Sequence, residues 1–434
     1  MRRRDFLAGL AAAPAARGAA RPPNIVMMLV DDMGRDWVSC YGAAHRTPQI
    51  DRLAAQGTRF ENAWCTPICT PTRVELLTGR YPFRTGWTDH HDVPRWGGKG
   101  LDWDREVTFA RVLKQAGYAT AIGGKWQVND FRDHPDALQR HGFDEHCMWT
   151  GYEEGNPPSD ARYHDPFLQI NGERGIRKGK FGPEVVHEFL TDFVRRNRQR
   201  PFLVYYPMIV THSPYVPTPL NQANPPKDQR GLYAGMVSYV DDTVGRMLRT
   251  LDELKLADNT LVIFSGDNGS PLGGVLNGVT CPGGKGRMTD LGSHTPLIAR
   301  APWLGNPGRV VDDLVDFTDI LPTMAEAAGA PLPRGVKLDG RSFLPVLAGK
   351  RGGRDWIYSQ RGKGRIVRDK RYKANWNGAF FDLKNDPLEK NDLAASADPE
   401  VVKARGRLRG VLAAMPPDGP PPFEGYGPRL KGEA

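Results

Sequence analysis

Four short apolar segments, each followed closely by polar residues, constrain the fold of this chain most strongly. The segments are residues 24–30, 118–122, 201–206 and 260–265. Apolar runs of this length, rich in Val, Ile, Leu and Tyr, are typical of buried strands. Stretches between them carry apolar residues at helical spacing, at 109–116, 183–198 and 232–254. Because strands and helices alternate, the sequence predicts the α/β class, with a mostly parallel central sheet flanked by helices.

The character of the sequence changes near residue 350. Beyond it, short segments rich in Arg, Lys, Gly and aromatic residues replace the long apolar runs. This pattern predicts a small C-terminal α+β subdomain, residues 350–415, with an antiparallel sheet and a helix near 399–414. We expect the main α/β domain to span 21–349, and the Pro- and Gly-rich residues 416–434 to form an extended tail.

The first twenty residues have the layout of an export signal. Residues 2–7 read Arg-Arg-Arg-Asp-Phe-Leu, and an alanine-rich stretch follows as far as residue 20. This arrangement predicts a twin-arginine-type signal, residues 1–20, and hence a periplasmic or secreted protein. An arginine-rich irregular start is the alternative. No later apolar run reaches membrane-spanning length, so we expect no stable membrane insertion after the signal is removed.

The cysteine count and the net charge bear on chemistry and partners. Five cysteines are an odd number, so at least one thiol must be free, reactive or modified. The formal net charge of +9 favours anionic substrates through long-range attraction. The positive excess is spread over many arginines, and we expect no nucleic-acid partner.

Polar residues that can bind a metal ion follow two of the apolar segments. Asp31 and Asp32 follow the first segment, and Asp267 and Asn268 follow the last. Open α/β sheets place their functional groups at the carboxyl ends of the strands. Such residues usually cap a loop or face solvent, but two pairs together favour a shared site. Their hard oxygen atoms suit Ca²⁺ or Mg²⁺ rather than zinc.

The most specific motif lies at residues 69–80, which read Cys-Thr-Pro-Thr-Arg-Val-Glu-Leu-Leu-Thr-Gly-Arg. This stretch resembles the signature of the formylglycine-dependent sulfatases, a family of the alkaline-phosphatase-like superfamily. In that family a modifying enzyme reads Cys-x-Pro-x-Arg and oxidises the Cys to formylglycine. The resemblance implies formylglycine at Cys69, with Arg73 holding the modified side chain. Cys65 also begins a Cys-Thr-Pro triplet, but it lacks an Arg four residues later.

The resemblance also implies roles for residues that would otherwise be read as structural or as surface groups. It implies that the two polar pairs hold a divalent cation, Ca²⁺ with Mg²⁺ as the alternative. Lys125, in Gly-Gly-Lys-Trp-Gln, and Lys285, in Gly-Gly-Lys-Gly, match lysines that act on the nucleophile and on sulfate. His212, in Thr-His-Ser-Pro, matches the histidine that contacts sulfate and helps to protonate the leaving alcohol.

The chain departs from the family pattern in two places. Gln127 stands where relatives carry a histidine that contacts formylglycine and is proposed to take its proton. Because Gln has no basic nitrogen near neutral pH, we expect slow sulfate elimination unless a neighbour such as His294 substitutes. Residues 289–296 differ as well. Residues 381–393 resemble the C-terminal turn of the family, so the resemblance runs from residue 23 to about 393.

The resemblance implies a sulfatase that converts a sulfate monoester to an alcohol and inorganic sulfate. The expected partners are a sulfated small molecule or glycan, and a formylglycine-generating enzyme before export. Two alternatives stay open: a phosphonate or phosphate ester hydrolase on the same fold, and a catalytically weak sulfated-glycan binding protein. We expect the loops 87–104 and 147–180 to determine specificity. Their aromatic residues could stack on sugar rings or simply pack: Trp96, Trp103, Trp149 and Tyr152.

Overall fold

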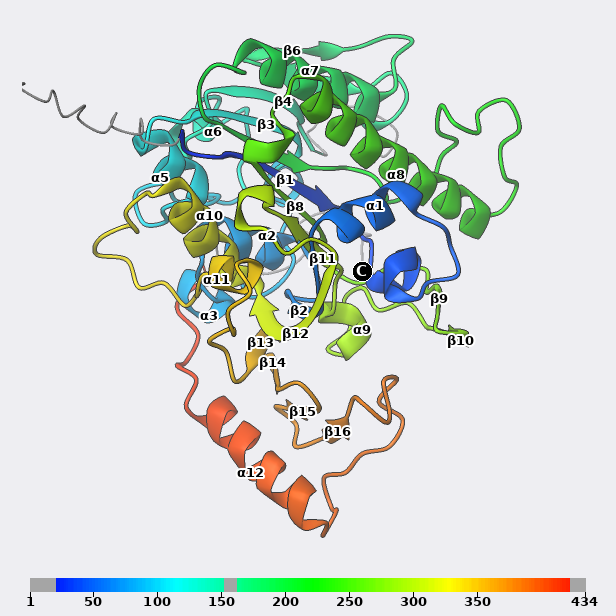
Figure 1. The fold of residues 1–434 in the computed structure, drawn as a ribbon, viewed down its shortest axis with the longest axis vertical. Coiled ribbons are helices and arrows are strands. Elements are labelled where there is room, and N and C mark those ends of the chain that lie inside the picture. Colours follow the sequence, from blue (N-terminus) through cyan, green and yellow to red (C-terminus); the bar gives the residue numbers. More distant parts are fainter. Residues whose placement is uncertain (1–20, 152–161, 422–434) are drawn as a thin grey trace, which may run out of the picture.

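The structure, a computed structural model, describes residues 21–151 and 162–421. The predicted export signal lies outside these ranges, as do Tyr152 and residues 422–434 of the predicted tail. A large α/β body occupies one end of the molecule, and a small subdomain ending in helix α12 (Pro399–Ala413) extends from it (Figure 1). No helix in the described ranges combines the length and the apolar character needed to cross a bilayer.

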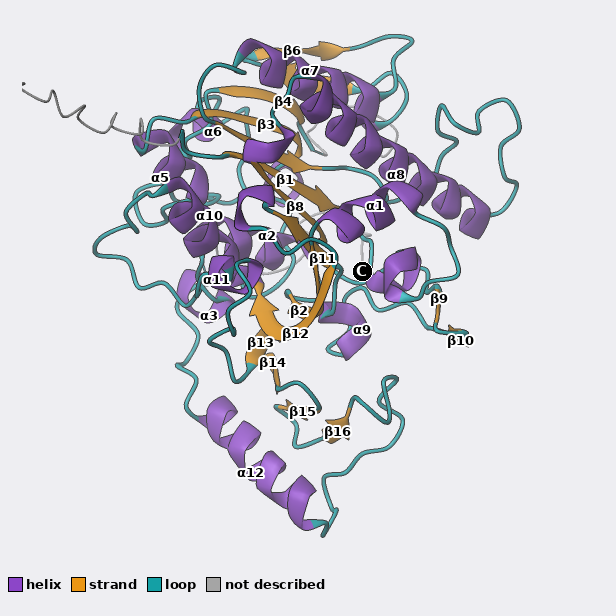
Figure 2. Cartoon of the chain, viewed as in Figure 1, coloured by secondary structure: helices purple, strands orange, loops and turns teal. Residues whose placement is uncertain are grey.

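A ten-stranded sheet runs through the middle of the large body (Figure 2). Its strands are β1 (Asn24–Val30), β2 (Thr58–Trp64), β3 (Ala119–Lys125), β4 (Glu145–Trp149), β5 (Phe167–Ile170), β6 (Glu173–Ile176), β7 (Phe202–Pro207), β8 (Thr260–Gly266), β11 (Leu297–Arg300) and β12 (Arg309–Asp316). Their spatial order is β12-β2-β11-β8-β1-β7-β3-β4-β5-β6. The five neighbours from β8 to β4 are parallel, and the antiparallel pairs involve β11 on one side and β5 on the other. The predicted α/β fold with a mostly parallel sheet is confirmed.

The four predicted strands lie side by side at the centre of this sheet, in the order β8-β1-β7-β3. The prediction for β1 matches the observed strand, whereas β3 runs three residues further than expected, through two glycines. Gly124 allows this extension because a Cβ atom there would lie 1.9 Å from the Pro207 carbonyl oxygen of β7. The extra length places Lys125 at the carboxyl edge of the sheet.

Helices cover both faces of the sheet. They are α1 (Pro48–Gln56), α2 (Cys69–Thr78), α3 (Pro82–Thr85), α4 (Val93–Trp96), α5 (Phe109–Gln115), α6 (Ala137–Arg140), α7 (Gly182–Arg196), α8 (Gln229–Glu253), α9 (Asp290–Ser293), α10 (Ile320–Ala328) and α11 (Leu344–Leu347). Successive side chains of β1 point to opposite faces. Met27 joins the apolar core beneath α2, α5 and α10, and Met28 joins the core beneath α1, α7 and α8. A strand buried on both faces is therefore apolar throughout its length.

The C-terminal subdomain has its own small core. Its antiparallel sheet contains β13 (Ile357–Arg361), β14 (Gly364–Arg368), β15 (Tyr372–Asn375) and β16 (Phe380–Asp382), in that order. Helix α12 packs Val401 and Leu408 against Val367 and Phe380 of this sheet. A separate short hairpin, β9 (Val275–Leu276) with β10 (Val279–Thr280), belongs to the large body. The predicted α+β subdomain with an antiparallel sheet is confirmed.

The chain returns to the large body after α12. Gly419 N donates a hydrogen bond to the Phe83 carbonyl of α3 (2.7 Å), and Gln360 Nε2 donates one to Asp418 Oδ1 (2.7 Å). Trp64 of β2 and Ile357 of β13 share an apolar cluster between the two sheets. The small subdomain thus contacts the large body through its first strand, through the chain that follows its helix, and through Arg368 of β14, which forms an ion pair with Asp290 of α9 (2.9 Å).

Candidate active site

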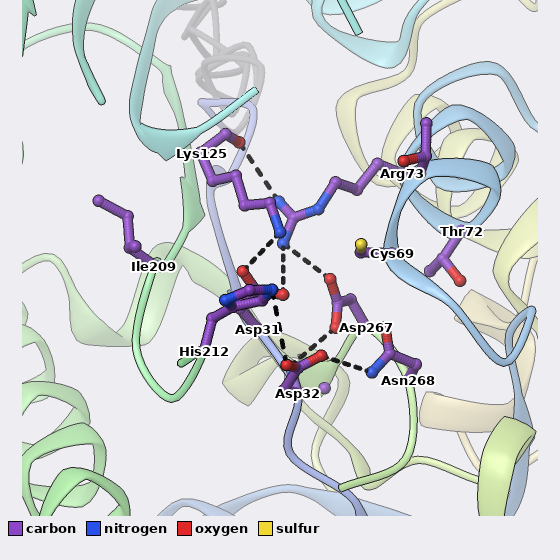
Figure 3. A network of polar contacts seen from close by, with 12 residues as sticks. Asp31, Asp32, Cys69, Thr72, Arg73, Lys125, Ile209, His212, Asp267 and Asn268 are labelled. Atoms are coloured by element: carbon purple, nitrogen blue, oxygen red, sulfur yellow. Dashed lines mark hydrogen bonds and ion pairs between the residues drawn. The ribbon is translucent and has the colours of Figure 1, made fainter. Parts of the chain in front are cut away.

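The carboxyl ends of β1 and β8 bring the two predicted metal-binding pairs together (Figure 3). The two strands are paired in parallel with Val30 opposite Gly266, so the residues that follow them begin at the same level. Asp32 N donates a hydrogen bond to Asp267 Oδ1 (3.0 Å), and Asn268 Nδ2 donates one to Asp32 Oδ1 (2.9 Å). All four side chains are buried, including Asp31.

The oxygen atoms of this cluster suit a divalent cation. Asp31 Oδ1 and Asn268 Oδ1 are buried and accept no hydrogen bond from the described residues, although the Arg73 guanidinium lies 3.5 Å from Asp31 Oδ1. Asp31, Asp32 and His212 each offer a ligand atom, and these three atoms lie within 4.8 Å of one another. Buried carboxylate and amide oxygens without donors are unfavourable unless another positive group meets them. The residues present therefore fit a hard cation such as Ca²⁺ or Mg²⁺.

Three positive side chains converge on the carboxylates from different parts of the sequence. The ion pairs are Arg73 Nη2 with Asp267 Oδ2 (2.7 Å) and with Asp31 Oδ1 (3.5 Å), Lys125 Nζ with Asp31 Oδ2 (2.7 Å), and Lys285 Nζ with Asp32 Oδ2 (2.6 Å). Three carboxylates thus face three cations. A divalent cation added to this balanced set would make the site positive, which favours an anionic substrate.

The groups of this cluster shift one another's pKa. Burial and the negative charge of Asp31 raise the pKa of the Asp267 carboxyl, and Arg73 opposes that shift. Burial alone would raise the pKa of the Asp31 carboxyl, but the neighbouring cations, Lys125 foremost, hold that pKa well below its usual range. Burial alone would lower the pKa of the Lys285 ammonium, but Asp32 outweighs burial and the pKa is raised. Both groups therefore remain ionised at neutral pH.

Cys69 is the first residue of α2 and lies beside Arg73 and Asp267 (Figure 3). Arg73 follows one helical turn later, so the two side chains share a helix face. Arg73 Nη1 also donates a hydrogen bond to the Lys125 carbonyl (3.2 Å), which fixes the guanidinium between α2 and β3. Cys65 has other surroundings, because its Sγ donates to the Ser293 carbonyl (3.3 Å).

His212 follows β7 and borders the cluster from the opposite side. Its Nε2 lies 3.8 Å from Asp32 Oδ2, and its Nδ1 lies 3.1 Å from Arg162 Nη1 and 2.8 Å from the Ser213 carbonyl oxygen. Burial lowers the pKa of the His212 imidazole, and the positive charges of Lys285 and then Lys125 lower it further. The ring is positioned to direct Nε2 toward the carboxylates.

Gln127 and His294 come from the two segments in which this chain departs from the family pattern. The Gln127 side chain is buried, and its backbone adopts the left-handed conformation (φ 75°). Its Oε1 accepts no hydrogen bond from the described residues. His294 is held elsewhere, because Nδ1 lies 2.9 Å from Asp290 Oδ2 and Nε2 lies 2.6 Å from the Glu61 carbonyl oxygen. Both nitrogens of that ring are occupied, so His294 does not substitute for a base at Cys69.

Sequence reasoning missed two residues of the site. His90, in the loop between α3 and α4, places Nδ1 3.5 Å from Cys69 Sγ. Arg162 contacts His212 and stacks over Trp149, with its guanidinium carbon 4.2 Å from the ring centroid. Both lie in loops predicted to determine specificity, but no spacing within those loops singled them out.

Comparisons with known proteins agree with this geometry. The family model described as Sulfatase matches residues 23–330. The chain belongs to the sulfatase family. It is 33% identical to mouse (Mus musculus) steryl-sulfatase over 428 residues, which covers 78% of this chain and 67% of that protein. Identity to human (Homo sapiens) arylsulfatase A is 31% over 478 residues, covering 95% of this chain and 91% of that protein.

Solved structures show the same relationship. The crystal structure of Ps i-CgsB in complex with k-i-k-neocarrahexaose superposes with a TM-score of 0.78 at 26% sequence identity, covering 93% of this chain and 94% of that chain. The predicted membership of the alkaline-phosphatase-like superfamily is confirmed. The protein is accordingly a hydrolase, and a sulfatase that acts on sulfate esters.

Proposed function

We propose that this sulfatase hydrolyses a sulfate monoester by means of a formylglycine made from Cys69 and a divalent cation, Ca²⁺ or alternatively Mg²⁺. One observation carries the proposal: Arg73, four residues after Cys69, forms an ion pair with Asp267, within a carboxylate cluster that Lys125 and Lys285 also contact. The predicted site residues are distant in sequence, and a structural cysteine would not require this convergence.

The divalent cation and the formylglycine would supply different chemistry. Asp31, Asp32, Asp267 and Asn268 would hold the cation, which supplies a Lewis acid for sulfate oxygens. A hydrated aldehyde at residue 69 supplies a nucleophilic hydroxyl and a second hydroxyl that allows sulfate to be released.

The remaining residues would bind the anion and assist departure of the alcohol. Arg73 and Lys125 are permanently charged in this site and would stabilise negative charge near residue 69. Lys285 stays protonated and can donate hydrogen bonds to sulfate or to the leaving oxygen. His212 would present Nε2 to the leaving oxygen, with Arg162 and Ser213 against its Nδ1. The role of Gln127 would be to position residue 69 through hydrogen bonds.

The substrate we propose is a sulfated glycan or a sulfated small molecule. A solved structure of 26% identity is a complex with a neocarrahexaose. Two of the predicted aromatic residues border the site: Trp96 contacts His90 edge to face (ring centroids 5.0 Å), and Trp149 lies under Arg162. Trp103 instead packs against His134 (5.2 Å), which favours a structural role. Aromatic faces at a sugar site would supply stacking area.

The test combines mass spectrometry with assays. Protein produced with an active formylglycine-generating enzyme is expected to carry formylglycine at Cys69 and an unmodified thiol at Cys65. The converted protein is then assayed on an aryl sulfate, an aryl phosphodiester and a panel of sulfated glycans. Faster turnover of the phosphodiester would favour the phosphorus-ester alternative, and glycan binding without turnover would favour the binding protein. Conversion at Cys65 alone would overturn the assignment of the nucleophile.

We also propose export through the N-terminal signal to the periplasm or the medium, with Cys69 modified beforehand. The support is the sequence of residues 2–7. Replacing Arg3 and Arg4 together by Lys is expected to retain the protein in the cytoplasm with its N-terminus uncleaved. Cell fractionation and N-terminal sequencing provide the measurement, and unchanged export would contradict the proposal.

A further inference from the structure

Lys285 lies in a loop, residues 281–289, that runs from β10 to α9 without helix or strand. The Lys285 backbone N–H donates to the Ser270 carbonyl (3.2 Å), and the Gly286 N–H donates to the Pro67 carbonyl (2.7 Å). The Lys285 ammonium forms an ion pair with Asp32 Oδ2 (2.6 Å). Because a lysine side chain is flexible, the position of its ammonium depends on how firmly the backbone of this loop is held.

The small subdomain contacts this loop and the following helix α9 at several points. Side chains from β13, β14, β15 and the chain after β16 take part. The contacts are Arg361 Nη1 with the Gly286 carbonyl, Lys373 Nζ with the Met288 carbonyl (2.9 Å), Arg368 Nη1 with Asp290 Oδ1 (2.9 Å), the Asp290 N–H with Glu389 Oε1, and Ser359 Oγ with Ser293 Oγ (2.9 Å). Of these contacts, the one made by Arg361 lies next to Lys285 in the chain.

Arg361 is the last residue of β13 and joins two loops of the large body. Its Nη1 donates to the Gly286 carbonyl, and its Nε donates to Asp89 Oδ1 (2.9 Å) in the loop 86–92, between α3 and α4. The same Asp89 oxygen accepts the His90 backbone N–H (2.7 Å). One guanidinium therefore connects the loop that carries Lys285 to the loop that carries His90.

The shape of a guanidinium suits this double contact. Its donors form a rigid planar fork, so Nε and Nη1 hold their two partners at a fixed separation, whereas a lysine ammonium is a single point. The fit at Gly286 is close, because its backbone is left-handed (φ 75°) and a Cβ atom there would lie 2.8 Å from Arg361 Nη1. The Arg361 side chain is 36% exposed, so its removal opens no cavity in the core.

We propose that Arg361 is a positioning residue for the reaction, which holds the Lys285 loop against the His90 loop and so keeps the Lys285 ammonium at the sulfate. This inference rests on the function proposed above, in which Lys285 donates hydrogen bonds to sulfate or to the leaving oxygen. Arg361 acts through the two loops and not through contact with the sulfate. The small subdomain then contributes to catalysis through the end of β13.

The first test is kinetic. Arg361→Met keeps an unbranched side chain and removes both contacts. We expect kcat/KM for an aryl sulfate to fall roughly 10-fold, which is less than the about 100-fold that a 1 Å misplacement can cost. A double-mutant cycle identifies the route: if Arg361 acts through Lys285, adding Arg361→Met to Lys285→Met should cause little further loss. Arg361→Lys can make one of the two contacts at a time and should have an intermediate rate.

Arg371→Met is the matched control. Arg371 belongs to the same subdomain, has a side chain of similar exposure (35%) and also has two partners, Asp382 (2.8 Å) and Glu400 (2.7 Å). Both partners lie within the small subdomain. The control should therefore keep the wild-type kcat/KM, and thermal unfolding of each variant shows whether it is folded.

A second measurement does not depend on activity. Hydrogen exchange followed by mass spectrometry reports how often backbone N–H groups leave their hydrogen bonds, and those of residues 284–287 are all bonded in the folded protein. We expect peptides that span these residues to exchange faster in Arg361→Met than in wild type or in Arg371→Met. Unchanged exchange would overturn the proposal. So would a wild-type kcat/KM for Arg361→Met, or an equal loss of rate with and without Lys285.

These outcomes separate the two proposals. If converted wild-type protein turned over no sulfate ester, the function proposed above would fail, whereas hydrogen exchange would still report on the Lys285 loop. If wild type were active and the Arg361 results were negative, only the role of Arg361 would fail.

Discussion

Glu75 offers a direct test of how this fold tolerates a buried acid. It lies in α2, is 1% exposed, and neither of its carboxylate oxygens accepts a hydrogen bond from the described residues. Burial raises the pKa of Glu75 well above its ordinary value of 4.5, and the negative charge of Asp316 raises it further; Arg354 opposes the shift. The folded protein therefore holds a proton on Glu75 at a pH where the unfolded chain has released it.

The sign and size of the effect follow from linkage. The raised pKa contributes stability that is fully present below about pH 4.5 and is lost as pH rises toward the folded-state pKa. Within that interval the loss approaches roughly 1.4 kcal/mol per pH unit, the free energy of one proton per pH unit. Glu75→Gln cannot release a proton, so its stability should lack this decline.

The assay is denaturant unfolding of both proteins at several pH values between about 5 and 8. We expect the free energy of unfolding of Glu75→Gln, minus that of wild type, to increase with pH at the slope given above. The comparison uses the slope because any fixed cost of burying the Gln amide cancels. Glu188→Gln, at an exposed position of α7, controls for the loss of a carboxyl group. Parallel curves for wild type and Glu75→Gln would refute the reasoning, because Glu75 would then be ionised in the folded protein.

Three further predictions concern the site and its surroundings. Asp267→Ala should abolish divalent-cation binding in calorimetry and most turnover; wild-type binding would show that the proposed ligand set is wrong. Arg354→Met leaves Asp316 and Asp319 without their shared cation and should cost roughly 3–5 kcal/mol in denaturant unfolding; a change within error would contradict this estimate. His294→Gln should lower the melting temperature but keep kcat per folded molecule, and a large loss of kcat would return His294 to the list of candidate bases.

The central strands were predictable because burial on both faces requires apolar residues throughout. Residues 24–30 meet this condition completely, and the observed β1 has the same bounds. The strand β11, between β8 and β2, was not predicted. It has only four residues and ends in Arg300. It forms because Leu297 and Ile298 pair with residues of both neighbouring strands, β2 and β8. β6 is largely exposed, so no apolar pattern marks it.

The site was partly predictable for a related reason. Asp31 and Asp267 follow strands whose apolar pattern is clear, and parallel neighbours bring their ends to one edge of the sheet. His90 and Arg162 come from loops, where position depends on contacts with Cys69, Trp149 and other distant residues rather than on local spacing. Contacts between residues that are distant in the chain produce no periodic pattern in the sequence.

If residue 69 carries the proposed formylglycine, the burial of α2 limits when its cysteine can be oxidised. Cys69 is fully buried, and so is every other residue of that helix through Thr78. An enzyme that reads and oxidises this segment must reach it as extended chain, so modification and folding compete for the same molecules. A chain that folds first would be locked as the thiol form. Conditions that slow folding, such as a lower growth temperature, should therefore increase the converted fraction for a given amount of modifying enzyme.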